Sequence, residues 1–260
     1  MIDDLTYQLD IQAGIYVANL VFASCHSYKG TKRGKRVHLC LSVSTNNAGI
    51  MGAAPSLTED GYETHFGTNH MGHALLTKLL MPLLLQTTEQ TNSDVRIVNV
   101  SSGGYYMTHS KGWDQDLVKT DMKDFGGGNG NLMSRYGQSK LAGVLHAKGL
   151  AKHYPSITAV AIAPGRVKTD LLDNMYRDGR DKFYAYFQRV YDVVIGAHDV
   201  DVGVYSQLWA ATEPKKERLA SGGVYFPVGK KDCESKFAKD DGMVDSLWQW
   251  TEKELAKKGY

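Results

Sequence analysis

Tyr136 and Lys140 stand four residues apart in a segment whose apolar pattern predicts a helix over 136–152. This spacing places both side chains on one helical face, so the ammonium can lie near the phenol. A free tyrosine titrates near ~10, and a neighbouring cation favours its charged form. Such a tyrosine can pass a proton to or from an alcohol or carbonyl oxygen. Alone, the pair is only a candidate, since the same spacing occurs on many exposed helices.

Two adjacent serines follow a short apolar run over 96–100 that predicts a buried strand. Open α/β sheets bind ligands at the carboxyl ends of their parallel strands. Ser102 is therefore a candidate to hold a substrate oxygen and stabilise its developing charge, with Ser101 as the alternative. The plainer interpretation is that both serines cap the strand end or open a turn.

Small residues follow two other predicted strands, over 37–43 and 158–163. Asn-Asn-Ala-Gly at 46–49 permits a sharp turn and the close approach of a flat ring. Ala-Pro-Gly-Arg-Val-Lys-Thr at 163–169 ends the later strand. Each could also be an ordinary turn or strand breaker.

The elements that would position these residues alternate along the chain. An amphipathic helix is predicted over 67–85, between the strands over 37–43 and 96–100. The helix over 136–152 then precedes the strand over 158–163. This order predicts an α/β fold with a Rossmann-like, doubly wound parallel sheet and crossover helices. The leucines that mark the first helix are Leu75, Leu76, Leu79, Leu80, Leu83 and Leu84.

Together the four motifs resemble the short-chain dehydrogenase/reductase family. The segment over 66–73, Phe-Gly-Thr-Asn-His-Met-Gly-His, is similar to the family's helix that carries a catalytic asparagine. The segments over 221–229 and 247–252 resemble the retinol-dehydrogenase-like branch that is common in fungi. The resemblance runs from about Asn46 to the end of the chain.

The resemblance implies a role for each matching residue. Tyr136 would be the general acid/base, and Lys140 would lower its pKa and hold the nicotinamide ribose. Ser102 would orient the substrate oxygen, and Asn69 would hold a water that links Lys140 to solvent. The residues implied to contact the cofactor are Asn46, Ala48, Gly49, Tyr136, Lys140, Val167 and Thr169.

The beginning of the chain departs from the family. The glycine-rich T-G-x-x-x-G-x-G motif, which admits the pyrophosphate of the cofactor, is absent. A strand–helix–strand unit takes ~30 residues, whereas 45 residues precede Asn46. We therefore expect a single domain that lacks the first one or two strand–helix units, with an atypical segment over 1–45 and a catalytic region over 46–260. One hypothesis is a truncated or misassembled gene model, or an alternative start, which sequencing of the transcript would test.

The resemblance implies an NAD(P)-dependent oxidoreductase that interconverts an alcohol and a carbonyl. By family habit the cofactor would be NADP, with NAD as the other possibility. An aromatic-rich segment over 171–197 would form either a lid over the substrate or packed helices. The aromatic residues suggest a small lipophilic alcohol or carbonyl as substrate, and relatives are often homodimers. The alternative is a catalytically inactive, truncated relative that acts as a binding or scaffold protein, which the missing glycine motif favours.

Composition excludes some classes of function. The 260 residues carry a net charge of +2, which gives no argument for nucleic acid as a partner. The three cysteines are widely spaced and predict neither a disulfide framework nor a metal site. The apolar stretch over 13–25 is shorter than the ~20 residues that span a bilayer, so we expect a cytoplasmic protein without a stable membrane anchor.

Overall fold

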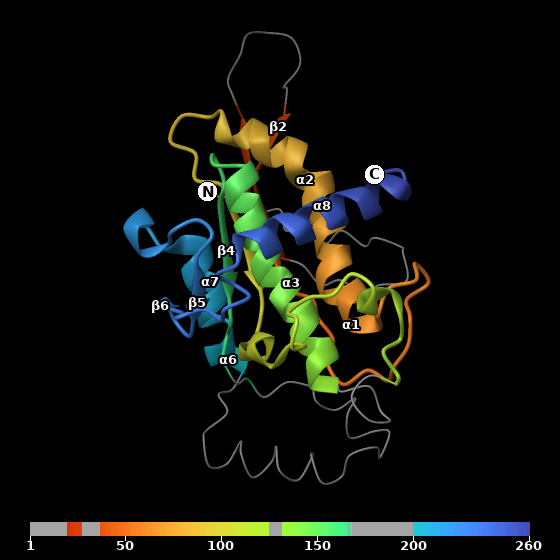
Figure 1. Ribbon diagram of the computed structural model, residues 1–260. Helices are drawn as coiled ribbons and strands as arrows, with labels where there is room; N and C mark the ends of the chain where they lie inside the picture. The colour runs from red at the N-terminus through yellow and green to blue at the C-terminus, as the bar shows by residue number, and fades with distance from the viewer. Residues whose placement is uncertain (1–19, 28–36, 125–131, 166, 168–199) are drawn as a thin grey trace.

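The computed structural model describes residues 20–27, 37–124, 132–165, 167 and 200–260 (Figure 1). In this part of the chain one sheet has the strand order β1-β2-β3-β4-β5-β6. Strands β2 to β5 are parallel, whereas β1 and β6 pair antiparallel at the two edges. The strands are β1 Leu20–Ser27, β2 Val37–Asn46, β3 Arg96–Val100, β4 Thr158–Ile162, β5 Val224–Phe226 and β6 Lys230–Lys231.

Helices connect the parallel strands as the sequence order requires. A π-helical turn over Gly67–Met71 joins α1 to α2, and a 3-10 helix over Gly103–Met107 follows β3. Shorter 3-10 turns occupy Leu117–Lys119 and Lys216–Arg218. The α-helices are α1 Thr64–Phe66, α2 Gly72–Thr88, α3 Leu132–His153, α6 Val200–Gly203, α7 Tyr205–Thr212 and α8 Asp241–Lys257.

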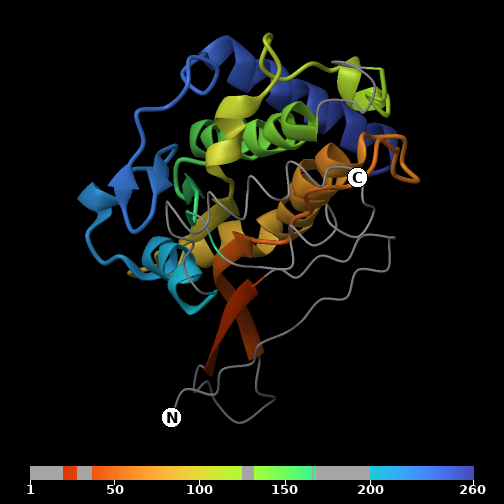
Figure 2. The ribbon, with the colours of Figure 1, turned by 90° about the horizontal axis from the view of Figure 1, so that it is seen from below.

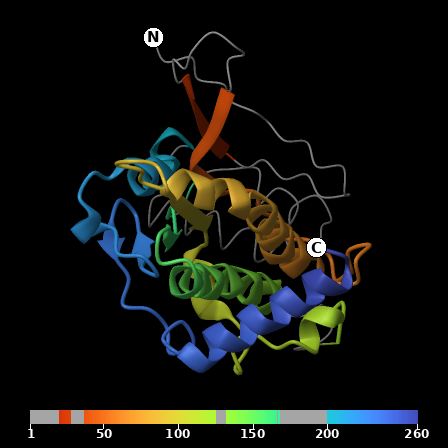
Figure 3. The ribbon, with the colours of Figure 1, turned by 90° about the horizontal axis from the view of Figure 1, so that it is seen from above.

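Helices cover both faces of the sheet, because alternate residues of its central strands point in opposite directions. Ile97 of β3 packs with Leu84 of α2 and Leu150 of α3. Its neighbour Val98 packs with Ala210 of α7 on the other face. Figure 3 shows α3 and α8 side by side across the sheet from α7. The α/β Rossmann-like class predicted from the sequence is therefore confirmed.

Strands β1 and β2 form a twisted antiparallel pair at one edge of the sheet (Figure 2). Leu20 pairs with Thr45 and Ser27 with Val37, so β1 begins beside the carboxyl end of β2. The register shifts between Phe22 and Ala23, where β2 carries one more residue than its partner. The predicted boundary between residues 45 and 46 lies inside β2. Within the described residues, β2 pairs with the antiparallel β1 on the side away from β3.

The predicted central elements agree with the structure, with longer bounds for several. The strand predicted over 96–100 matches β3, and those predicted over 37–43 and 158–163 correspond to β2 and β4. The helix predicted over 67–85 begins earlier, as α1 and the π-helical turn. Thr169 and the segment over 171–197 lie outside the described residues. None of the described helices combines the length and the apolar character needed to cross a membrane.

Candidate functional site

Tyr136 and Ser102 meet at the carboxyl end of β3. Ser102 caps the 3-10 helix over 103–107, and its Oγ accepts a hydrogen bond of 3.1 Å from the amide of Gly104. A side-chain hydrogen bond also joins Ser102 to Tyr136. A Cβ on Gly104 would lie 2.8 Å from Cε1 of Tyr136, so only glycine lets the ring approach this closely. Burial raises the pKa of Tyr136, and the hydrogen bond from Ser102 opposes that rise.

Lys140 lies one helical turn after Tyr136, as its spacing predicts. Its Nζ is 5.7 Å from the centroid of the Tyr136 ring and donates a 3.0 Å hydrogen bond to the carbonyl of Val100. Burial lowers the pKa of Lys140 to about 8, since a charged amine is disfavoured away from water. The contact with Val100 ties this ammonium to the end of β3.

Asn69 and Gly49 complete the cluster from the other side. In the π-helical turn, the Asn69 amide donates 2.9 Å to Ser139 Oγ and 3.0 Å to the carbonyl of Ile50, whose amide donates 2.8 Å to Asn69 Oδ1. A Cβ on Gly49 would lie 3.2 Å from both Asn69 Oδ1 and Lys140 Nζ. Such π-helical turns often occur at functional sites. Five of the residues selected from the sequence are thus brought together: Gly49, Asn69, Ser102, Tyr136 and Lys140.

Ser101 has a different environment from Ser102. Its hydroxyl donates 2.9 Å to the main-chain carbonyl of Lys140, and its amide donates to the carbonyl of Ile162. Ser101 therefore joins β3 to α3 and β4, while Ser102 faces the phenol. Between the two alternatives, this geometry favours Ser102.

Asn46, Ala48 and Val167 are the remaining predicted cofactor contacts among the described residues. Asn46 is fully buried, and its side-chain amide donates 3.0 Å to Thr77 Oγ1 and 2.7 Å to Asn99 Oδ1. This asparagine therefore links β2 to α2 and β3. Ala48 is buried, and Val167 contacts Gly203 of α6.

Comparison with known proteins decides the family. No family model matches the chain. The short-chain dehydrogenase/reductase drtF of Aspergillus calidoustus is 32% identical over 82% of this chain and 68% of its own length. The chain belongs to the short-chain dehydrogenase/reductase family. Retinol dehydrogenase 12 of Mus musculus is 36% identical over 82% of this chain, which spans 60% of that relative. A crystal structure of a protein from Mycobacterium paratuberculosis superposes with a TM-score of 0.57 at 26% identity, covering 83% of this chain and 67% of the other.

The matched relatives place this short-chain dehydrogenase/reductase among oxidoreductases, so a nicotinamide cofactor is implied. The nicotinamide end fits the residues present. A lysine ammonium has three N–H donors, and among the described residues Lys140 Nζ makes one hydrogen bond, to Val100. Its other donors suit the hydroxyls of a ribose, and Gly49, which has no Cβ, lets Lys140 Nζ and Asn69 Oδ1 lie close to its backbone. The pyrophosphate end has no such counterpart, because the described residues beside β2 form an antiparallel strand rather than a glycine-rich turn into a helix.

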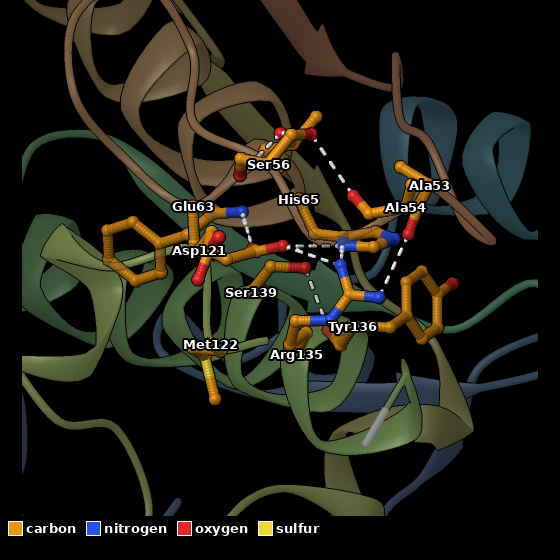
Figure 4. Close-up of polar contacts among 12 residues, drawn as sticks. Ala53, Ala54, Ser56, Glu63, His65, Asp121, Met122, Arg135, Tyr136 and Ser139 are labelled. Atoms are coloured by element: carbon orange, nitrogen blue, oxygen red, sulfur yellow. Dashed lines mark hydrogen bonds and ion pairs between the residues drawn. The ribbon is translucent and has the colours of Figure 1, made fainter. Parts of the chain in front are cut away.

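One cluster beside the phenol was missed by the sequence analysis: Glu63, His65 and Arg135 (Figure 4). Arg135 Nη1 lies 3.1 Å from Glu63 Oε1, and a 2.8 Å hydrogen bond joins that oxygen to His65 Nδ1. All three side chains are almost wholly buried. Glu63 and Arg135 are 72 positions apart, so no local motif in the sequence predicts their contact. The one available signal was an arginine directly before the candidate tyrosine.

Proposed function

We propose that this chain is an NAD(P)-dependent oxidoreductase that interconverts an alcohol and a carbonyl, with Tyr136 as the general acid/base. The observation that supports it most is the hydrogen bond between Tyr136 and Ser102, next to the Lys140 ammonium. An acid/base group, a hydroxyl donor and a cation at one strand end are the parts that this chemistry needs.

A bound nicotinamide would supply or accept the hydride. In the reducing direction, Tyr136 donates its proton to the carbonyl oxygen, and Ser102 donates a hydrogen bond to the same oxygen. Burial raises the pKa of Tyr136, which keeps it a phenol at neutral pH and ready to act as the acid. Lys140 favours the phenolate that remains after transfer. Asn69, held at Ile50 and Ser139, fixes the wall beside Lys140.

The substrate class follows from relatives rather than from a cavity. The mouse relative is named a retinol dehydrogenase, so a lipophilic alcohol or aldehyde is the substrate that we propose. We propose NADP as the cofactor, with NAD as the second choice. Lys140 would hold its nicotinamide ribose, with Val167 and Thr169 at the nicotinamide end and Gly49 on the adenosine side.

Titration of the purified chain with NADPH and NADH, followed by an assay with a lipophilic aldehyde, tests this function. Micromolar binding together with turnover would support it. The alternative, a catalytically inactive relative with a binding role, is favoured by the missing glycine-rich motif. Absence of binding at millimolar cofactor would decide for that alternative.

A further inference from the structure

We propose that Arg135 is a positioning residue that fixes the segment over 49–54 and the Tyr136 ring relative to each other. This inference deepens the proposed function and rests on it for its catalytic consequence. Arg135 is 2% exposed, and its partners Glu63 and His65 are 1% and 0% exposed. Burying a guanidinium costs free energy unless acceptors satisfy its N–H donors, so the contacts of Arg135 require a defined geometry.

The guanidinium joins two parts of the chain that approach the site separately. Nη1 pairs with Glu63 Oε1 at 3.1 Å, and Nη2 donates 2.9 Å to the main-chain carbonyl of Ala53 (Figure 4). Ala53 follows closely after Gly49 and Ile50, which contact Lys140 and Asn69. One planar side chain therefore holds the segment that runs past the candidate site.

Glu63 transmits the same constraint to Asn69. Its Oε2 accepts a 2.9 Å hydrogen bond from the amide of Phe66 and so caps α1. Helix α1 continues directly into the π-helical turn that carries Asn69. Arg135 thus contacts, through one carboxylate, the element that positions the candidate asparagine.

His65 brings the cluster into contact with the phenol ring. Its imidazole meets the Tyr136 ring edge to face, with centroids 6.2 Å apart and an interplanar angle of 79°. Met51 packs against Tyr136 as well, and Gly104 lies against the ring at Cε1. A shift of the segment over 49–54 or of α1 would therefore move the walls around Tyr136 and admit water to it.

An arginine is required because the contact needs two nitrogens pointing in two directions. Nη1 and Nη2 form a planar fork, whereas lysine offers a single nitrogen. Lysine at 135 can pair with Glu63 but cannot hold the Ala53 carbonyl at the same time. Arg135→Lys therefore separates charge pairing from positioning.

The test compares Arg135→Lys with the unaltered chain in three measurements: thermal unfolding, steady-state kinetics, and the ¹³Cζ resonance of Tyr136 during a pH titration. That resonance is assigned by its loss in Tyr136→Phe. We expect a lower Tm, because the carbonyl of Ala53 loses a buried hydrogen bond, a kcat lower by about 10- to 100-fold at unchanged cofactor affinity, and a Tyr136 titration displaced toward the ordinary value of tyrosine. An unchanged kcat and an unchanged titration would overturn the proposal.

Arg96→Lys is the matched control, because Arg96 is also buried and also forks, to Asp94 and to the carbonyls of Ala210 and Glu213. It should lower Tm while the Tyr136 resonance stays in place. The double variant Glu63→Gln/Arg135→Met removes both charges of the cluster. If the double variant has a higher Tm than Arg135→Lys but an equally low kcat, the positioning role is supported. If both Tm and kcat return to the values of the unaltered chain, the proposal is overturned.

The resonance separates this inference from the proposed function. A chain without turnover whose Tyr136 resonance still moves in Arg135→Lys keeps Arg135 as a positioning residue and contradicts the oxidoreductase. A chain with turnover that is indifferent to Arg135→Lys keeps the oxidoreductase and contradicts the positioning role.

Discussion

The Tyr136 hydroxyl is the group on which the proposed chemistry depends. Tyr136→Phe removes this hydroxyl and leaves a ring of nearly the same volume against Gly104 and His65. We expect kcat to fall by about 10³-fold, the range of general acid catalysis, because no other described proton donor has the same place. Cofactor affinity should change little. Steady-state kinetics and calorimetric titration measure the two quantities, and a variant that keeps most of its activity would rule out Tyr136 as the proton donor.

Lys140 gives the folded chain a distinct dependence on alkaline pH. Burial lowers its pKa from 10.5 to about 8 in the folded state. Between these pH values the unfolded chain binds more protons, so the Lys140 contribution to the free energy of unfolding rises with pH. We expect the difference in this free energy between the unaltered chain and Lys140→Met to rise by roughly 3 kcal/mol across the window. Urea unfolding at pH 7 and near pH 10 measures it, and a flat difference would contradict the buried amine.

At the scale of elements, the close approach of α3 to the 3-10 helix sets the distance between Tyr136 and Ser102. A Cβ on Gly137 would lie 2.8 Å from the carbonyl oxygen of Gly104 and from the amide nitrogen of Thr108. Because both atoms belong to the backbone, Gly137→Ala should push the two elements apart. We expect a loss of roughly 1–3 kcal/mol in unfolding free energy and a lower kcat.

Gly143 on the same helix is the control for this prediction. Nothing lies within 4 Å of a Cβ placed there, so Gly143→Ala should stabilise the chain by up to ~1 kcal/mol through helix propensity. Chemical unfolding and kinetics on both variants provide the comparison. Equal behaviour of the two alanines would show that the α3 contact does not constrain the site.

The sequence predicted those elements whose apolar pattern is long or strongly periodic. Helices α2 and α3 and strands β2 to β4 follow directly from such patterns. Strand β5 has three residues and β6 has two, too few for a period of two to appear. Strand β1 lies in a short apolar run with no clear alternation, and its direction depends on long-range pairing with β2.

The candidate site was predictable only where a motif is local. Tyr136 and Lys140 share one helix, so their proximity follows from the helical period. The partners of Asn46 depend on the packing of three elements, and Asn99 is 53 residues away. No pattern in the sequence therefore predicts that the Asn46 side chain makes hydrogen bonds inside the molecule. The Glu63–Arg135 pair was missed for the same reason.

At the scale of the whole molecule, Glu254 of α8 ties the end of the chain to the loop before α1. Its carboxylate pairs with Lys119 and Lys257 and accepts a 3.1 Å hydrogen bond from the Tyr62 hydroxyl. Burial raises the pKa of Glu254, but the hydrogen bonds from Lys119, Lys257 and Tyr62 and the charge of Lys119 outweigh it and lower the pKa to about 2. The ordinary value for glutamate is 4.5.

The Glu254 contribution to stability is therefore present above pH 4.5 and is lost as pH falls toward 2. We expect Glu254→Gln to cost about 2 kcal/mol at neutral pH, and the difference from the unaltered chain to shrink across that acid range. Thermal and urea unfolding between pH 2 and 7 measure the effect. A difference that is independent of pH would show that the ion pairs add nothing.

The direction of β1 has a consequence for molecular recognition. Because it runs against β2, the strand brings its first residue, Leu20, to the edge of the sheet where Asn46 ends its neighbour. A parallel strand there would instead deliver its last residue and lead into a helix whose exposed amides attract anions. At this corner the described chain therefore offers strand backbone in place of an electropositive helix tip. The described residues would then distinguish nucleotides by the ribose and nicotinamide ring that lie near Lys140, and not by the pyrophosphate that joins the two nucleosides.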